Sequence, residues 1–129
     1  MRIRRLLVAN RGEIALRILR TCERLGIETV LAASDADLDS PAARSADRVV
    51  RLGPALPERS YLSVEAVIGA ARASGATAVH PGYGFLSENP ALAAACAQAG
   101  ILFVGPTAEH LRVLGDKLEA RAAAVAAGL

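Results

Sequence analysis

Residues 80–89 combine the residue types of a ligand-binding loop. The segment reads His-Pro-Gly-Tyr-Gly-Phe-Leu-Ser-Glu-Asn and follows a short apolar run at residues 76–79. Because Gly82 and Gly84 flank Tyr83, the backbone can turn sharply there and another group can approach it closely. A loop that leaves the carboxyl end of a strand lies at the edge where open α/β sheets bind ligands. The 80–89 loop is therefore the best candidate for a binding site in the chain.

The polar residues of this loop are expected to organise it. Ser87 is a natural N-cap, and Glu88 and Asn89 would follow it in the first turn of a helix, where negative charge suits the helix dipole. His80 precedes a proline at the predicted strand end, and the sequence offers it no Ser or Cys partner and no metal-ligand cluster. We interpret His80 as a structural hydrogen-bonding group.

Basic residues outside the loop offer two further candidates. Lys117 follows Gly115-Asp116 at the predicted start of a helix, where its ammonium could meet a phosphate as a compact point charge, although spacing alone favours a surface lysine. Arg17, Arg20 and Arg24 form a basic ridge on the first predicted helix. The ridge is either a solvated face or a subunit contact, since arginine is favoured at interfaces.

Two segments imitate known sites without completing them. The turn at residues 10–13 has only one of the glycines of a G-x-G-x-x-G dinucleotide-binding fingerprint, and the charge of Glu13 would repel a phosphate. Asp35, however, lies at about the spacing of the carboxylate that binds the ribose in that fold. Residues 35–39 begin like a calcium loop, but Ala46 stands where a bidentate glutamate is needed. A dinucleotide site and a calcium site are both disfavoured.

Composition and charge narrow the class of protein. The 129 residues suit one domain, 53% are hydrophobic, and the net charge of +2 comes without a basic block, which argues against nucleic acid as the main partner. The apolar run near the N-terminus is too short for a signal peptide, and no stretch approaches the roughly 18 apolar residues of a membrane span. We therefore expect a cytoplasmic protein with buried, reduced thiols at Cys22 and Cys96.

Strand and helix patterns alternate along the whole chain. Apolar runs predict strands at residues 3–9, 29–33, 48–52, 77–79 and 101–104. Helical spacing and caps predict helices at residues 13–25, from Ser63 to about 73, at 88–99, from Thr107 to about 114, and one ending near 127. The first helix should bury the side formed by Ile14, Ile18, Cys22 and Leu25. The alternation indicates an α/β fold, a Rossmann-like parallel sheet with right-handed crossovers and helices on both faces.

Five short segments together match one family. They are residues 7–15 with Arg17-Ile18, then residues 59–62, 80–89, 103–106 and 115–117. In this order and spacing, over essentially the whole chain, the sequence resembles the N-terminal (pre-ATP-grasp) domain of biotin carboxylase. This enzyme is the ATP-grasp part of the biotin-dependent acyl-CoA, pyruvate and urea carboxylases.

The resemblance implies an activity, cofactors and partners. In this family ATP, with Mg²⁺ (or Mn²⁺), phosphorylates bicarbonate to carboxyphosphate, and the CO₂ released from it carboxylates a ureido nitrogen of biotin. The biotin is held on a carrier protein or domain, a carboxyltransferase uses the product, and the full enzyme is expected to be a homodimer that binds neither nucleic acid nor a membrane. The catalytic and metal-binding residues lie after this segment, so the fragment is expected to be inactive and to hold none of the cofactors tightly.

The resemblance also assigns roles to residues. Lys117 would contact the ATP phosphates. The 80–89 loop would face the carboxylation site, with Tyr83 and Gly84 near the biotin ring and Glu88 ordering the loop or a neighbouring domain. The loop residues assigned to this site are His80, Gly82, Tyr83, Gly84, Phe85 and Glu88. Residues 1–114 would form the domain, and residues 115–129 a linker helix leading to an ATP-grasp domain.

The chain departs from the family pattern at two places. Ala42 stands where many members carry a histidine. Arg20 matches a dimer-contact arginine of bacterial members, but Arg24 occupies the place of its acidic partner, and the acid stands one position earlier at Glu23.

Two other interpretations stay open at this point. One is the equivalent domain of another ATP-grasp ligase, such as a carbamoyl-phosphate or purine-pathway enzyme, which would not be expected to carry the 80–89 run. The other is a stand-alone interaction module that docks a carrier or a subunit without catalysis.

Overall fold

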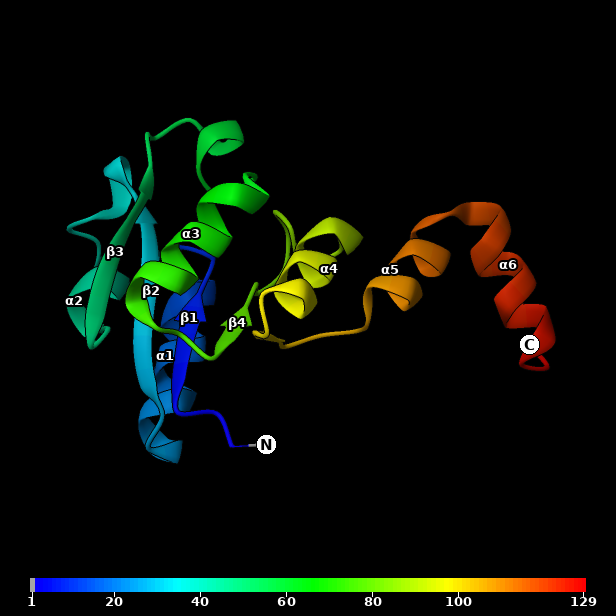
Figure 1. Cartoon of the computed structure of the whole chain (residues 1–129), viewed down its shortest axis with the longest axis horizontal. Coiled ribbons are helices and arrows are strands. Elements are labelled where there is room, and N and C mark those ends of the chain that lie inside the picture. The colour runs from blue at the N-terminus through cyan, green and yellow to red at the C-terminus, as the bar shows by residue number, and fades with distance from the viewer. Residues whose placement is uncertain (1) are drawn as a thin grey trace.

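A single parallel sheet organises the molecule (Figure 1). The computed structural model describes residues 2–129, with the backbone alone described at Lys117. Five strands lie in the order β3-β2-β1-β4-β5, and every neighbouring pair is parallel. The strands are β1 Arg5–Val8, β2 Glu28–Ser34, β3 Arg48–Gly53, β4 Ala78–His80 and β5 Leu102–Phe103. The predicted parallel α/β sheet is confirmed, with strand ends that differ by at most two residues from those expected.

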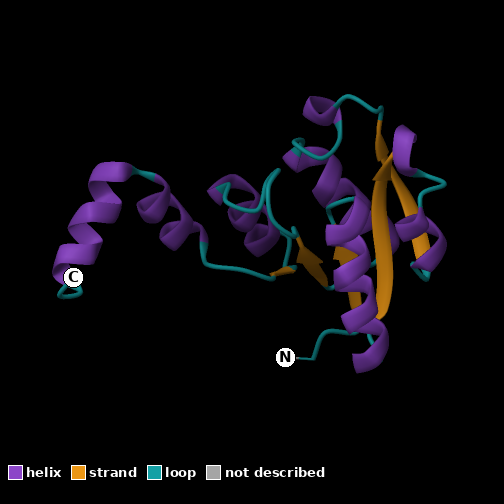
Figure 2. Ribbon diagram, turned by 180° about the vertical axis from the view of Figure 1, so that it is seen from behind, coloured by secondary structure: helices purple, strands orange, loops and turns teal. Residues whose placement is uncertain are grey.

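Helices cover both faces of this sheet. The helices are α1 Gly12–Leu25, α2 Pro41–Ser45, α3 Val64–Ser74, α4 Pro90–Gln98, α5 Ala108–Gly115 and α6 Lys117–Ala126. Successive side chains of a strand point to opposite faces, so Leu6 and Val8 pack with α1 and α2, whereas Leu7 packs with α3 and α4. Figure 2, seen from behind, shows α1 lying across the sheet on the side opposite α3. Burial on both faces explains why β1 and β2 read as continuous apolar runs.

The start of α4 corrects one expectation. Asn89, and not Ser87, is the N-cap, and its side-chain oxygen accepts a 2.8 Å hydrogen bond from the N–H of Ala91. Pro90 occupies the first helical position, where its missing N–H costs nothing and where it disfavours a helical conformation at the preceding residue. The 80–89 loop therefore keeps its final residues, and the helix begins two positions later than predicted.

The buried face of α1 is also rotated from the predicted one. The buried residues are Ala15, Leu19 and Cys22, whereas Leu25 is 65% exposed. Ala15 is fully buried, and its small side chain lets the helix lie close to the sheet on a side that a count of large apolar residues does not favour. Ile14 and Ile18 are left half-buried at the flank of the helix.

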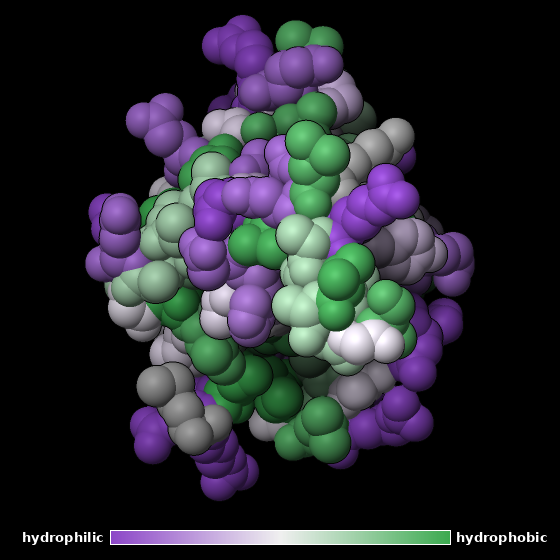
Figure 3. Space-filling view, turned by 90° about the vertical axis from the view of Figure 1, so that its right-hand side faces the viewer, coloured by the Kyte–Doolittle hydropathy of each residue, from purple (hydrophilic) through white to green (hydrophobic). Residues whose placement is uncertain are grey.

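The last two helices extend away from the sheet (Figures 1 and 2). Viewed from that end, Figure 3 shows apolar patches interspersed with hydrophilic side chains. Leu114, Leu118 and Val125 are each more than 60% exposed. No helix within residues 2–129 has the length and apolar character needed to cross a bilayer.

Candidate functional site

The 80–89 loop leaves the carboxyl end of β4 in a left-handed conformation. Gly82 and Gly84 have φ values of 67° and 73°, and Phe85 has a φ of 42°. A Cβ atom at Gly82 would lie 2.6 Å from Nδ2 of Asn10, whereas one at Gly84 would meet open space. The close approach expected at the two glycines is therefore present at Gly82, where the approaching group is a side chain of the protein itself, and not at Gly84.

Asn10 is a residue of this site that sequence reasoning did not identify. Its side chain is buried at the end of β1, and Nδ2 donates 2.8 Å hydrogen bonds to the carbonyl oxygens of both Pro81 and Tyr83. Its Oδ1 accepts a 2.8 Å bond from the N–H of Arg11. The 10–13 turn thus holds the beginning of the 80–89 loop.

His80 closes the first turn of the loop. Its Nδ1 accepts a 3.0 Å hydrogen bond from the N–H of Gly82, which requires that this nitrogen carry no proton. Burial lowers the pKa of the imidazole below its usual value of 6.5, so the ring is neutral at physiological pH. The histidine therefore acts here as a hydrogen-bond acceptor that shapes the backbone.

The outward residues of the loop line cavities that they share with the C-terminal helices. Phe85, Glu88 and Asn89 line a cavity of about 530 Å³ together with Gly115 and Asp116. A neighbouring cavity of about 550 Å³ is lined by other residues from the same two segments, among them Gly82, Ser87 and Leu114. The structure thus brings together two segments that are about 30 positions apart in the sequence.

Gly115-Asp116-Lys117, the 115–117 turn, joins α5 to α6. The side chain of Asp116 caps α6 by accepting a 2.9 Å hydrogen bond from the N–H of Glu119. Lys117 is the first residue of that helix, and its side chain lies outside what the structure describes. Gly115 and Asp116, which line the shared cavity, thus directly precede the N-terminus of α6, the positive end of its dipole.

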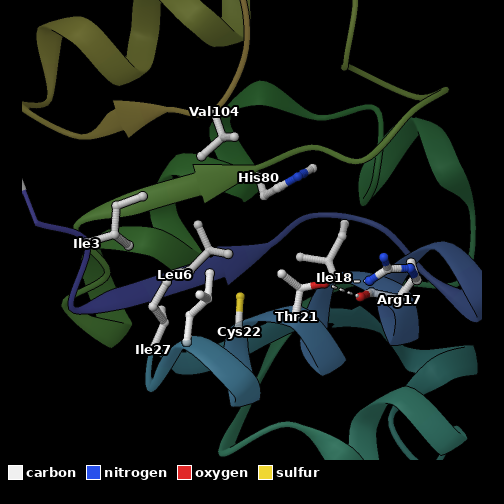
Figure 4. Close-up of a pocket in the computed structure, with 10 residues that line it drawn as sticks. Ile3, Leu6, Arg17, Ile18, Thr21, Cys22, Ile27, His80 and Val104 are labelled. Atoms are coloured by element: carbon white, nitrogen blue, oxygen red, sulfur yellow. Dashed lines mark hydrogen bonds between the residues drawn. The ribbon is translucent and has the colours of Figure 1, made fainter.

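A second cavity lies on the other side of the loop. Tyr83, which is 71% exposed, lines it together with His80 and Arg17 of α1. An adjoining apolar groove of about 340 Å³ runs between α1 and the sheet, and Figure 4 shows Arg17 at the end opposite Ile3 and Ile27. The residues lining this groove are Ile3, Leu6, Arg17, Ile18, Thr21, Cys22, Leu25, Ile27, His80 and Val104.

The basic ridge of α1 is exposed along the same helix. Thr21 Oγ1 accepts hydrogen bonds from both Arg17 and Arg24, so these two arginines share one face. Arg20 is exposed between them. Arg17 borders the cavity next to Tyr83, and α1 lies apart from the turn between α5 and α6 (Figure 1).

In the acidic segment that follows β2, an aspartate forms an ion pair with an arginine. Nε and Nη2 of Arg51 donate hydrogen bonds of 2.6 and 2.8 Å to the two carboxylate oxygens of Asp35. Arg51 lowers the pKa of Asp35 through this bidentate hydrogen bond. Within residues 2–129, no group of three or more His, Cys, Asp or Glu side chains is placed to hold a metal ion.

The two cysteines are free and buried, as predicted. Burial raises the pKa of both thiols, for Cys96 to about 11. Neither thiol is therefore activated as a nucleophile at neutral pH.

Comparison with known proteins identifies the family. Residues 2–111 match the family described as biotin carboxylase, N-terminal domain. The chain is 51% identical over 127 residues to biotin carboxylase of Pseudomonas aeruginosa, an alignment that covers 98% of this chain and 28% of that protein. It is 48% identical to mitochondrial pyruvate carboxylase of Rattus norvegicus, covering 98% of this chain and 11% of that protein.

A solved structure confirms the likeness in three dimensions. The urea carboxylase of Kluyveromyces lactis superimposes with a TM-score of 0.96 at 43% identity, covering 98% of this chain and 11% of that one. The chain spans little more than a quarter of the length of the bacterial biotin carboxylase it matches. Fold, sequence and family match agree, and the chain belongs to the biotin carboxylase family, of which it represents the N-terminal domain.

Proposed function

We propose that this chain is the N-terminal part of a larger ligase that carboxylates biotin at the expense of ATP. The observation that carries the proposal is the shared cavity, where the 80–89 loop faces Gly115 and Asp116. These are the two segments to which the family resemblance assigns biotin and ATP phosphates. A phosphorylated intermediate made at one segment would therefore lie close to the acceptor at the other.

The 115–117 turn supplies the phosphate side of this site. Lys117 stands at the N-terminus of α6, where the helix dipole and a compact ammonium charge both favour a polyphosphate. The ammonium would neutralise charge on the β- and γ-phosphates as the terminal phosphoryl group moves to a bicarbonate oxygen. When bound, Mg²⁺ (or Mn²⁺) would share this neutralisation, held by glutamates in the part of the relatives that this chain does not span.

The 80–89 loop supplies the biotin side. Its exposed residues are Tyr83, Phe85 and Glu88, and its glycines expose backbone where a flat bicyclic ring could approach. We assign Tyr83 and Gly84 to the neighbourhood of the ring, and Glu88 to the ordering of the loop or of a neighbouring domain. No residue of this segment is proposed as the base that accepts the ureido proton.

The division into a domain and a linker helix follows the same proposal. We propose residues 1–114 as the sheet domain and residues 115–129 as a helix leading to an ATP-grasp domain. The exposure of Leu118 and Val125 supports this division, because apolar side chains on a helix far from the sheet suit burial against a further domain. On this proposal the isolated segment turns over neither ATP nor biotin and holds no cofactor tightly.

Partners of the whole enzyme are proposals too. They are a biotin carboxyl carrier protein or domain, a carboxyltransferase and a second copy of the enzyme, with the Arg17, Arg20 and Arg24 ridge at or near the dimer contact. Because Arg24 replaces the expected acid, the ion pair would have to use Glu23 or form elsewhere. The first assembly to test is a cytoplasmic acetyl-CoA carboxylase of fatty acid biosynthesis; a methylcrotonoyl-CoA carboxylase is the second, since the chain is 51% identical both to a bacterial biotin carboxylase and to a methylcrotonoyl-CoA carboxylase subunit.

Bicarbonate-dependent ATP hydrolysis, measured with and without free biotin, tests the function. The protein to use is the parent enzyme, meaning the longer protein that carries this segment. We expect turnover that needs bicarbonate and rises with biotin, and that collapses in Lys117→Ala. Arg121→Ala is the matched control, because Arg121 lies one turn further along the exposed surface of α6. ATP turnover that ignores both bicarbonate and biotin would instead indicate another ATP-grasp ligase.

A further inference from the structure

The 10–13 turn lacks the glycines of a dinucleotide-binding fingerprint, yet it is among the most extensively hydrogen-bonded segments of the site. Asn10 is 1% exposed and uses both Nδ2 hydrogens and Oδ1 in hydrogen bonds of 2.8 Å. Only the amide nitrogen can donate to two carbonyl oxygens, so these partners also fix which way the amide points. A buried side chain bonded in this way is committed to one arrangement of the loop that it touches.

The loop in turn is shaped to receive this side chain. Gly82 has a φ of 67°, and a Cβ atom there would lie 2.6 Å from Asn10 Nδ2 and 2.7 Å from Cγ2 of Ile14. The contact with Asn10 cannot be relieved cheaply, because three hydrogen bonds hold that side chain. The backbone at Gly82 therefore lies directly against the 10–13 turn.

The next residue of the turn reaches the other half of the loop through two side chains. Arg11 donates to both carboxylate oxygens of Asp37, at 2.7 and 2.8 Å. The hydroxyl of Tyr61 donates to Asp37 Oδ2 at 2.6 Å, and the ring of Tyr61 stacks on Phe85 with centroids 4.9 Å apart and planes 20° from parallel. Asp37 and Tyr61 are buried, and the Arg11 hydrogen bond is the main cause that lowers the pKa of Asp37.

Phe85 is the residue whose backbone most needs this support. Within residues 2–129 it is the one non-glycine with a positive φ, a conformation that persists only where the surroundings determine it. The stack on Tyr61 is a contact that Phe85 makes in this backbone conformation and that would hold it there. Phe85 also lines the cavity shared with Gly115 and Asp116.

We infer that Asn10 and Arg11 form a positioning clamp that sets the shape of the 80–89 loop before any ligand binds. Asn10 holds Pro81 and Tyr83 directly, and Arg11 holds Phe85 through Asp37 and Tyr61. This inference rests on the proposed function, since the clamp matters for catalysis only if the loop receives biotin. Asn10 and Tyr61 are positioning residues, because they act through the loop and do not line the shared cavities.

The decisive variant is Asn10→Asp in the parent enzyme, with Gln98→Glu as the matched amide-to-acid control on the exposed end of α4. Asn10→Asp keeps the size of the side chain but removes both donors and turns a carboxylate toward two carbonyl oxygens. We expect about tenfold faster amide hydrogen exchange over residues 82–87 and about tenfold higher KM for biotin, because two buried hydrogen bonds are lost. KM for ATP should stay within about twofold, since the phosphate side is untouched.

Tyr61 separates positioning from general damage and covers a failure of Asn10→Asp to fold. Tyr61→Phe keeps the stack on Phe85 but cuts the link to Asp37, so it should raise KM for biotin only part of the way. Tyr61→Leu removes the stack as well and should raise that KM as Asn10→Asp does. Unchanged loop exchange in Asn10→Asp and Tyr61→Leu, or equal changes in both KM values, would overturn the clamp. Wild-type enzyme without biotin-stimulated turnover would count against the proposed function, and a biotin-responsive wild type with unaffected variants would count against the clamp alone.

Discussion

The 80–89 loop is held by the side chain of Asn10, which lies 71 and 73 positions before the two residues it bonds, whereas the 115–117 turn is held by its immediate neighbours. Asp116 bonds the N–H three residues ahead, Thr107 caps α5 in the same way, and Arg112 pairs with Glu109 and Glu119 on the two adjoining helices. One half of the candidate site is therefore a product of the whole fold. The other half is a product of two helices.

This difference teaches how the two halves can work together. A loop fixed by long-range buried bonds keeps its shape whether or not a ligand is present, and changes shape only if the sheet domain is disturbed. A turn fixed by exposed local caps can move as a unit with whatever packs against it. We therefore interpret the biotin side as preformed and the phosphate side as adjustable.

The largest contrast should come from leucine truncations in the two regions. Leu92→Ala on α4 removes a fully buried side chain and should lower the free energy of unfolding by about 3–4 kcal/mol. Leu118→Ala on α6 removes a side chain that is 79% exposed and should change that free energy by less than about 0.5 kcal/mol. Urea denaturation of the 129-residue chain measures both free energies of unfolding. Equal losses in the two variants would contradict the contrast between the regions.

The next effect concerns two aspartates that are each paired with an arginine. Asp37→Ala leaves the Tyr61 hydroxyl and Arg11 without their buried partner and should destabilise the chain by about 2–3 kcal/mol. Asp35→Ala breaks a similar bidentate pair with Arg51, but at the exposed surface, and should lower the melting temperature much less. Thermal melts followed by circular dichroism compare them. A larger loss in Asp35→Ala would show that burial does not decide the outcome.

The two loop glycines sharpen the comparison within the loop. Gly82→Ala adds a clash with Asn10 to the strain of a positive φ and should cost about 2–3 kcal/mol, whereas Gly84→Ala adds the strain alone and should cost about 1 kcal/mol. Denaturant midpoints of the two variants test the difference. A Gly82→Ala variant as stable as Gly84→Ala would mean that Asn10 yields easily.

The smallest effect is a pH dependence at His80. Its folded-state pKa lies below the usual 6.5 because of burial, so between these values the unfolded chain binds more protons and stability falls as the pH drops below 6.5. His80→Gln should make the stability of the chain less dependent on pH over that window. His110→Gln, at an exposed histidine, is the control. An unchanged slope in His80→Gln would contradict the account of the neutral imidazole.

The sequence predicted the sheet well because each strand carries its own signal. Glu28–Ser34 was expected as residues 29–33, and α1 and α3 end within one residue of the expected positions, each followed by a glycine in a left-handed conformation. The N-cap of α4 was missed because Ser87 and Asn89 are both good caps. Pro90 decides between them, because proline suits the first helical position after Asn89.

The clamp could not be predicted from the sequence, because its two sides come together only through the order of the strands in the sheet. Val8 of β1 pairs with His80 of β4. Two residues beyond each of these positions, Asn10 contacts Gly82. A lone asparagine after a strand gives no indication of its partner until that pairing is known. The same holds for Tyr61, whose hydroxyl bonds to Asp37 24 positions away and whose ring stacks on Phe85.

Steady-state kinetics of Tyr83→Ala and Lys117→Ala in the parent enzyme test the central claim most directly. That claim is that the preformed 80–89 loop serves biotin and the 115–117 turn serves ATP. We predict that Tyr83→Ala raises KM for biotin by about tenfold while KM for ATP is unchanged. The residual turnover of Lys117→Ala should show a raised KM for ATP and an unchanged KM for biotin. If both variants change the two KM values alike, the two segments do not form separate halves of one site, and the account is contradicted.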